Sequence, residues 1–112
     1  VEGAGGLLSP LTWHHSTLDL ALRLKADVVV VAADVLGTQN HVLLTLRVLQ
    51  SADLAARAVI LSAPACADAS TGSNAAALAR VIDVPIVSVP RTDTPEPHLV
   101  SLWAELSGPL SR

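Results

Sequence analysis

A carboxylate and a run of small residues open the sequence and could together hold a ligand. Glu2 is followed by Gly3, Ala4, Gly5 and Gly6. Glycines let the backbone approach a bound ligand closely, and a carboxylate that directly follows a strand is well placed to face one. The pattern predicts a site for a metal ion and a phosphate. A glycine turn with a solvated Glu explains the spacing equally well.

A second candidate lies where a run of valines and alanines gives way to a helical pattern. Gly37, Thr38, Gln39 and Asn40 form this junction. The first amides of a helix have no partner within it, so they can bind a carboxylate or a phosphate. We therefore expect an anion site here. An ordinary Thr or Asn cap on a strand-to-helix loop is the alternative.

Other reactive side chains give weaker patterns. Cys66 is the one cysteine, which excludes an intrachain disulfide framework and fits a cytoplasmic protein. No Gly-x-Ser-x-Gly motif is present, and we expect Ser73 to cap a helix. The four histidines lack the compact spacing of a zinc site, so we expect them to be solvated or capping residues. They are His14, His15, His41 and His98.

Alternating strand and helix patterns must position these residues. Strands are expected at residues 27–33, 58–62 and 84–89, and helices around residues 18–25, 42–49, 78–82 and 99–106. The core must be aliphatic, because the sequence is 51% hydrophobic but has no Phe, Tyr or Met. We predict an α/β fold with a parallel sheet flanked by helices. Ligands should bind beyond the carboxyl ends of the strands, in loops after Val1, Ala33, Ser62 and Val89.

Two of these segments carry more apolar residues than one packed face requires. The strand at residues 27–33 does not alternate, which predicts that both of its faces are covered. The helix at residues 42–49 is apolar around nearly its whole circumference. One sheet face cannot cover such a helix, so a second surface is needed, and a homodimer would supply it.

Charge and hydropathy exclude several classes of partner. The net charge is −3 and the seven basic residues are scattered, which argues against nucleic acid and anionic membranes. The longest apolar run, residues 28–33, is far shorter than the roughly 20 residues that span a bilayer. No basic segment leads into an apolar one at the start, so no signal peptide is expected.

The order and spacing of these segments resemble dethiobiotin synthetase, a family with a P-loop NTPase-like fold. The resemblance rests on VEGAGGLLSPL from Val1 to Leu11, on DLA at residues 19–21, on the valine strand and on LGTQNHVLLTL at residues 36–46. It continues more loosely to Pro90. It covers nearly all of this chain but only the second half of the family, so residues 1–112 are expected to be the carboxyl-terminal part of one domain.

The resemblance implies an activity and its small molecules. The family uses ATP and Mg²⁺ to carboxylate 7,8-diaminopelargonic acid with CO₂ and to close the ureido ring of dethiobiotin. It also implies a homodimer in which each active site is shared between subunits. No Gly-x-x-x-x-Gly-Lys-Thr loop occurs in the sequence. We therefore expect the isolated chain to be inactive without the amino-terminal half.

The resemblance also assigns roles to residues of this chain. Glu2 would bind Mg²⁺, and the backbone of the glycine segment would border the nucleotide. Thr38, Gln39 and Asn40 would hold the carboxylate of the substrate. The implied nucleotide-binding residues are Glu2, Gly3, Ala4, Gly5, Ser62, Ala63, Pro90, Arg91, Thr92 and Glu96.

Ser62 departs from the pattern, because many members of the family have at this position an Asn that contacts the adenine base. The departure predicts weaker discrimination among nucleoside triphosphates. Two other functions remain open. The chain could be a related domain of a larger protein, as in cobyrinic-acid amidases or phosphotransacetylases. It could also be a non-catalytic dimerisation or ligand-sensing module, which the lack of a P-loop would suit.

Overall fold

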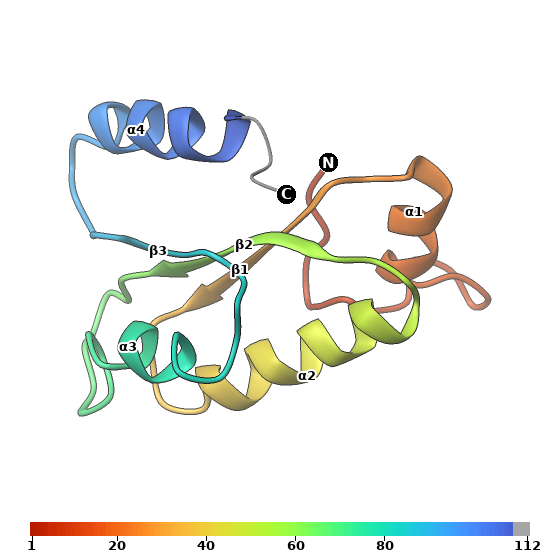
Figure 1. Ribbon diagram of the computed structural model, residues 1–112, viewed down its shortest axis with the longest axis horizontal. Coiled ribbons are helices and arrows are strands. Elements are labelled where there is room, and N and C mark those ends of the chain that lie inside the picture. Colours follow the sequence, from red (N-terminus) through yellow and green to blue (C-terminus); the bar gives the residue numbers. More distant parts are fainter. Residues whose placement is uncertain (109–112) are drawn as a thin grey trace.

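The computed structural model describes residues 1–108. In chain order, the elements are α1 (Thr17–Leu24), β1 (Val28–Ala33), α2 (Thr38–Ser51), β2 (Ala56–Ser62), α3 (Asn74–Leu78), β3 (Ile86–Val89) and α4 (Glu96–Ser107). Strands and helices alternate, and the helices flank a parallel sheet (Figure 1). The predicted α/β class is confirmed. Residues 109–112, which the expected domain includes, lie outside the described part.

The three parallel strands are ordered β1-β2-β3 as they are in the sequence. In this register Val31 pairs with Ile60, and Ile60 pairs with Val87. Pro85 directly precedes β3, where its missing amide hydrogen breaks no ladder, and its carbonyl accepts a 2.8 Å hydrogen bond from the Val59 amide. The carboxyl ends of all three strands therefore meet at one edge of the sheet, where ligands are expected.

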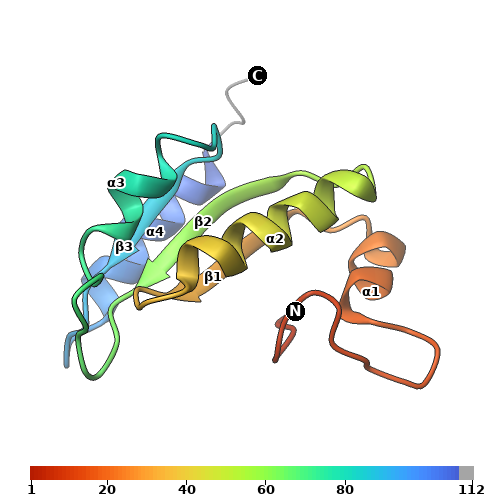
Figure 2. The same cartoon turned by 90° about the horizontal axis from the view of Figure 1, so that it is seen from below.

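Helices α2 and α3 cover one face of the sheet (Figure 2). Val59 and Leu61 are two residues apart on β2, so both point to this face. Together with Val42 of α2 and Leu78 of α3 they form the centre of the core, and none of these side chains is more than 1% exposed. The core is aliphatic, as the composition predicts.

The opposite face and the β1 edge are covered less completely. Helix α4 lies on this opposite side (Figures 1 and 2). Val31 of β1 is 66% exposed, so the prediction that both faces of this strand are covered is wrong for this structure. The physical reason is that β1 is an edge strand and the segment before α1 stands off from it, leaving a cavity of about 260 Å³.

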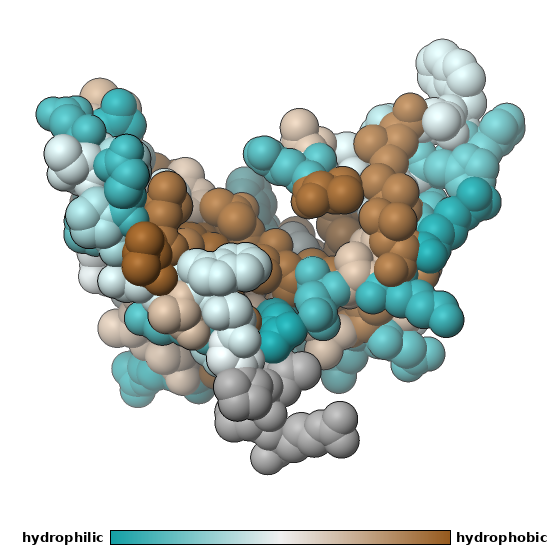
Figure 3. Space-filling view, turned by 90° about the horizontal axis from the view of Figure 1, so that it is seen from above, coloured by the Kyte–Doolittle hydropathy of each residue, from teal (hydrophilic) through white to brown (hydrophobic). Residues whose placement is uncertain are grey.

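Viewed from above, the molecule has a hollow with hydrophobic residues on its floor and flanks (Figure 3).

A strand was expected to end at Val1, with Glu2 directly after it, but Val1 belongs to no strand. A strand requires a hydrogen-bonded neighbour. Within residues 1–108, β1 pairs only with β2, so this expectation is also wrong.

Helix α1 begins with reciprocal capping. The Ser16 hydroxyl accepts a hydrogen bond from the Asp19 amide, while the Asp19 carboxylate accepts one of 2.6 Å from the Ser16 amide. The Ser16 hydroxyl also donates to this carboxylate, over 2.8 Å. The bonds from the Ser16 amide, first, and from the Ser16 hydroxyl lower the pKa of Asp19 below its ordinary value. Lys25, with φ of 49°, ends the helix in the left-handed conformation. Figure 2 shows α1 and the preceding segment standing away from the rest of the molecule.

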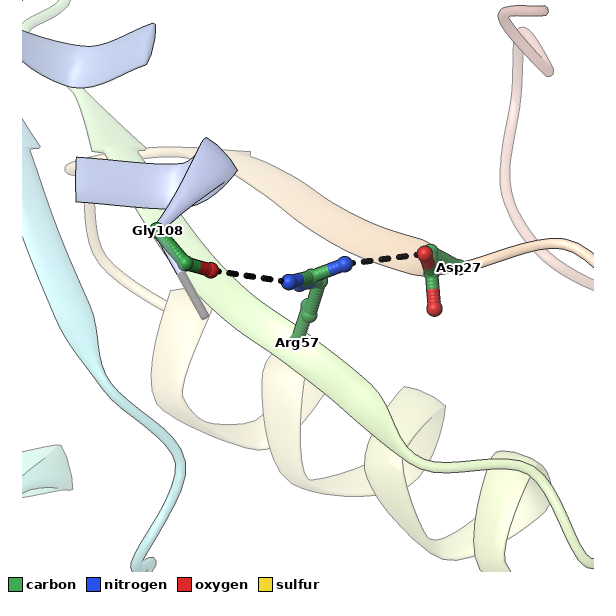
Figure 4. Close-up of polar contacts among 3 residues, drawn as sticks. All are labelled: Asp27, Arg57 and Gly108. Carbon is green, nitrogen blue, oxygen red and sulfur yellow. Dashed lines mark hydrogen bonds and ion pairs between the residues drawn. The ribbon is translucent and has the colours of Figure 1, made fainter. Parts of the chain in front are cut away.

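Arg57 of β2 joins the residue before β1 to the residue after α4 (Figure 4). Its guanidinium donates to the Asp27 carboxylate over 2.9 Å, immediately before β1. It also donates to the Gly108 carbonyl over 3.2 Å, immediately after α4. This one side chain therefore links α4 to the sheet.

Two helices differ in detail from the sequence patterns. Helix α3 ends at Leu78, and the residues up to Ile82 continue only as turns, with amides of both Val81 and Ile82 bonded to the Leu78 carbonyl. Ser73 precedes α3 but does not cap it, because its hydroxyl donates to the Ser70 carbonyl instead. None of the helices within residues 1–108 has the length and apolarity needed to cross a membrane.

Candidate functional site

The glycine segment before α1 is shaped by close backbone contacts. A Cβ atom at Gly3 would overlap the side chain of Thr17, so a larger residue here would force Thr17 to move. Gly5 has φ of +86°, a conformation that favours glycine. The Thr17 hydroxyl beside Gly3 is buried, and it alone among the buried side-chain polar atoms of the described chain lacks a hydrogen-bond partner. Glu2 itself is exposed.

The turn into α2 offers fewer free amides than the sequence predicts. Gly37 adopts φ of +92°, and Thr38 begins the helix as a residue only 3% exposed. The Thr38 amide is not free, because it donates to the Val35 carbonyl over 3.2 Å. Within residues 1–108, the amides of Gln39 and Asn40 have no hydrogen-bond partner. These two amides are the ones that could bind an anion.

One cleft joins the glycine segment to the start of α2. It has a volume of about 620 Å³, and Gly3, Gly5 and Thr38 all line it. Glu2 instead borders the 260 Å³ cavity between the glycine segment and β1. Residues of both predicted sites therefore line one cleft, whereas Glu2 borders the adjacent 260 Å³ cavity. Ala4, Gln39 and Asn40 line neither hollow.

A separate pocket of about 290 Å³ lies at the carboxyl ends of β2 and β3. It gathers five of the predicted nucleotide-binding residues, and Glu96 does not line it. The start of the loop after β2 is joined to the end of β3 by a 2.9 Å hydrogen bond from the Ala63 amide to the Val89 carbonyl. The gathered residues are Ser62, Ala63, Pro90, Arg91 and Thr92.

A buried polar network lies at the carboxyl end of β1, and it was not among the predicted site residues. Asp34 follows β1 directly and is 7% exposed. Its carboxylate accepts hydrogen bonds from the Gly72 amide at 2.8 Å and from the Asn74 side chain at 2.7 Å. The Asn74 carbonyl oxygen in turn accepts a 2.9 Å bond from the Gln39 side chain. A polar residue at the carboxyl end of a predicted strand was the signal that could have indicated it.

Asp68, in the loop between β2 and α3, holds the turn between β1 and α2. Its carboxylate accepts hydrogen bonds from the Ser70 hydroxyl at 2.6 Å and from the Leu36 amide at 2.7 Å. It also accepts bonds from the amides of Ser70 and Thr71. These bonds, that of the Ser70 hydroxyl first, lower the pKa of Asp68 from 3.8 to about 2. The carboxylate is therefore charged throughout the neutral range.

The remaining reactive side chains form no site of their own. His15 contacts Thr12 through Nδ1 and Arg23 through Nε2, in an exposed position. Cys66 is exposed and free. Within the described chain, no group of three His, Cys, Asp or Glu residues could hold a metal ion. Mg²⁺ is commonly held by one or two carboxylates together with substrate phosphates. Glu2 could therefore serve as one ligand, and these residues do not form a complete metal site.

The parallel sheet with helices on its flanks, open hollows at the carboxyl ends of its strands and a glycine segment beside them define an open-sheet α/β protein, and the family profile that it matches is P-loop NTPase-like. A family profile described as an AAA domain matches residues 1–97. The chain belongs to this AAA domain family. Its resemblance to dethiobiotin synthetase is also confirmed, because relatives with that name match it.

The relatives place the chain more closely. An ATP-dependent dethiobiotin synthetase of Anaeromyxobacter sp. (strain Fw109-5) is 47% identical over 83 residues, covering 72% of this chain and 37% of the relative. That of Caulobacter sp. (strain K31) is 40% identical over 95 residues, covering 84% and 41%. The biotin biosynthesis bifunctional protein of Bordetella avium (strain 197N) is 35% identical over 106 residues, covering 94% and 22%. The chain thus spans less than half the length of each of these relatives. No solved structure matches it.

Proposed function

We propose that this chain is the part of an ATP-dependent dethiobiotin synthetase that carries one side of the nucleotide site and the binding site for the substrate carboxylate. The observation that supports this most directly is the shared cleft of Gly3, Gly5 and Thr38. Two segments that resemble the family, more than thirty residues apart in the sequence, border one hollow at the carboxyl ends of the strands. Such an edge is where open α/β sheets bind ligands.

Each hollow has a proposed occupant. The pocket of Ser62, Ala63 and residues 90–92 would receive the base of the nucleotide, and the cleft beside β1 would receive the phosphates and 7,8-diaminopelargonic acid. The free amides of Gln39 and Asn40 follow Thr38 but do not line this cleft, and they would hold the carboxylate end of the acid across the dimer interface. When bound, Mg²⁺ would neutralise charge on the transferring phosphoryl group. Glu2 would be one of its ligands, and Glu96 would contact the nucleotide from the start of α4.

The complete enzyme requires parts that this sequence lacks. No residue here supplies the phosphate-binding loop or its lysine. We propose that the chain works with an amino-terminal half that carries this loop, as a cytoplasmic homodimer. Two leucines could contact the second subunit: Leu44 on α2 is 56% exposed, and Leu36, just before α2, is 82% exposed. The outward side of α2 also carries His41, Arg47 and Gln50, so it is less apolar than the sequence pattern predicts.

The proposal is tested by measuring dethiobiotin formation from ATP, CO₂ and 7,8-diaminopelargonic acid by the complete synthetase that contains this segment. Glu2→Gln should lower kcat by at least about tenfold, as loss of a metal-supporting group commonly does. Glu105→Gln, at an exposed position of α4, is the matched control and should change kcat less than about twofold. Equal rates for the wild type and Glu2→Gln would refute the assignment of Glu2. The purified 112-residue chain should form no product.

Nucleotide selectivity provides a second test. Ser62 should discriminate poorly among nucleoside triphosphates, because a hydroxyl offers fewer fixed hydrogen bonds than an amide. Ser62→Asn in the complete synthetase should raise the preference for ATP over GTP by about tenfold, the value of one well-made hydrogen bond. Competition between the two nucleotides measures this ratio. A wild-type preference already as sharp as that of the variant would contradict the proposal.

A further inference from the structure

The pocket at the carboxyl ends of β2 and β3 has a lining that suits a flat, uncharged ring. Its volume of about 290 Å³ is close to the lower limit of about 300 Å³ for small-molecule sites, so it suits a base better than a whole nucleotide. Val89 and Leu99 give it apolar walls, and His98 of α4 adds a planar side chain. It is also lined by one guanidinium, that of Arg91, and one carboxylate, that of Asp93. Their opposite charges offset each other, which does not favour a triphosphate here.

These two charged side chains have no partner within the described chain. Arg91 and Asp93 are two residues apart in the loop between β3 and α4, and both are exposed. Within residues 1–108 neither side chain forms a hydrogen bond, and the ion pair of this part joins Arg57 to Asp27 instead. A guanidinium offers only donors and an ionised carboxylate only acceptors. The pocket therefore presents free donors and free acceptors to a ligand.

The polar groups beside Asp93 hold the loop without using its carboxylate. The Thr94 amide donates to the Thr92 hydroxyl over 3.1 Å, which closes a short turn around Asp93. Ser62, at the end of β2, lines the same pocket. Its hydroxyl can both donate and accept, so Ser62 alone does not distinguish one base from another. Selection of the base must therefore come from the two charged side chains.

Guanine matches these side chains better than adenine does. Its N1 hydrogen and its 2-amino group lie side by side and suit the two oxygens of a carboxylate, while its O6 and N7 accept from Arg. Adenine has an amino group at C6 and no hydrogen at N1. We infer that Asp93 and Arg91 are specificity-determining residues that select guanine, with Asp93 accepting from N1 and the 2-amino group and Arg91 donating to O6. The inference rests on the proposed function, in which this pocket receives the base.

The Asp93 contact is tested by calorimetric measurement of nucleotide binding to the complete synthetase that contains this segment. ITP has the O6 of GTP but lacks the 2-amino group, so the ratio of their dissociation constants reports this contact. The wild type should bind GTP at least about tenfold more tightly than ITP, as a hydrogen bond to a charged group would give. Asp93→Asn should reduce this difference to about twofold or less. A full difference in the variant would overturn the role of Asp93.

A gain of affinity distinguishes recognition from loss of folding. Xanthine has a carbonyl at C2 where guanine has its amino group, so it suits an Asn side chain, which both donates and accepts. Asp93→Asn should therefore bind XTP at least about tenfold more tightly than the wild type does. A misfolded variant cannot gain affinity in this way. Failure to gain affinity for XTP would count against the inference.

The matched control is Asp83→Asn, which removes the same charge elsewhere. Asp83 is exposed and precedes β3, so it lies at the amino ends of the strands, away from this pocket. Its dissociation constants for all four nucleotides should stay within about twofold of those of the wild type. An equal change in Asp83→Asn and Asp93→Asn would show a general effect of charge, and would overturn the assigned contact.

The Arg91 contact is tested by comparing ITP with ATP, which differ at C6. Arg91→Met keeps much of the side-chain stem but removes every donor. It should weaken the binding of GTP and ITP about tenfold and that of ATP at most about twofold, because adenine has no oxygen at C6. An equal loss for all three nucleotides would show that Arg91 contacts the ribose or the phosphates, and would contradict its assignment to the base.

Dethiobiotin formation separates this inference from the proposed function. If the wild type makes no dethiobiotin with ATP or GTP but shows the binding differences, the proposed function fails and the selection of guanine is supported. If product forms but GTP and ITP bind equally, the proposed function holds and the inference is overturned. Binding of ATP about tenfold tighter than that of GTP would mean that the pocket selects adenine, and would also overturn the inference.

Discussion

Two regions of this molecule have similar hydrophobic side chains, but these side chains are buried in one region and exposed in the other. Where α2 and α3 cover the sheet, Val59 and Leu78 are fully buried. At the β1 edge and in the segment before it, Val31 is 66% and Trp13 98% exposed. Both regions are rich in aliphatic residues, and α1, β1 and α2 form where the sequence predicts them. The difference is that only the first region has packing partners within the chain.

The comparison shows that a hydrophobic pattern predicts the need for burial but does not identify the partner. Large contiguous apolar patches are rare on soluble monomers and commonly mark contact surfaces. The hollow in Figure 3, with hydrophobic residues on its floor and flanks, is a surface of this kind. Mutations should therefore have large effects on stability on the α2 and α3 side and small effects at the β1 edge.

The largest effect is expected at Leu78, which is fully buried against the sheet. Leu78→Ala should lower the free energy of unfolding by about 2–5 kcal/mol, because it removes buried methyl groups and leaves a cavity. Leu44→Ala is the matched control at a position 56% exposed, and should change it by about 0.5 kcal/mol or less. Urea-induced unfolding measures both. Similar losses would show that the two sides are equally packed.

Two valines of neighbouring strands sharpen the contrast further. Val59→Ala should cost about 2 kcal/mol, since two buried methyl groups are deleted from a side chain with no exposed surface. Val31→Ala should cost about 0.5 kcal/mol or less, because that side chain is already largely in water. Thermal unfolding of the two variants gives the difference. A loss at Val31 as large as at Val59 would reveal a buried environment at the β1 edge.

A smaller effect is expected within the less packed region itself. Ser16→Ala should destabilise α1 by about 1 kcal/mol, because it removes the cap that bonds to Asp19. Amide hydrogen exchange of α1 measures this locally. Ser51→Ala is the control, since the Ser51 hydroxyl lies exposed at the end of α2. Unchanged protection in Ser16→Ala would mean that the cap does not limit the opening of α1.

The smallest expected effect is a dependence on pH. The pKa of Asp68 is lowered from 3.8 to about 2, so its bonds stabilise the folded chain above pH 3.8. This contribution is lost as the pH falls from 3.8 through about 2. Asp68→Asn should remove it, making stability less dependent on pH in that range. Unfolding at several acidic pH values measures the slope, with Asp83→Asn as the control for the loss of one exposed charge. An unchanged slope in Asp68→Asn would contradict the prediction.

The fold was largely predictable from the sequence because strand and helix patterns are local. The valine run and the Pro85 position indicated β1 and the start of β3, and the bounds shifted by at most two residues at each strand end. The exposure of Val31 was not predictable, because it depends on which elements lie beside β1. Periodicity also overestimated α3, since Val81 and Ile82 continue the helical spacing after the helix has ended.

The site was predictable to a smaller extent. Glycines and helix starts are visible as sequence patterns, so the segments that line the cleft could be named. Asp34 and Asn74 are 40 positions apart, and nothing in their spacing shows that they meet. Their contact depends on the folding of two loops over the ends of β1 and β2. The paired Thr38 amide escaped prediction for the same reason, because the Val35 carbonyl reaches it only through the turn at Gly37.

The strand order has a consequence for engineering. Because consecutive strands are direct neighbours, there is no gap in the middle of the sheet into which another strand could be inserted. Any added strand must join at a flank, beside β1 or β3, and would leave the contacts of β2 with α2 untouched. This chain is therefore suited to splitting and reassembly experiments, in which a separately expressed partner docks without repacking of the existing core.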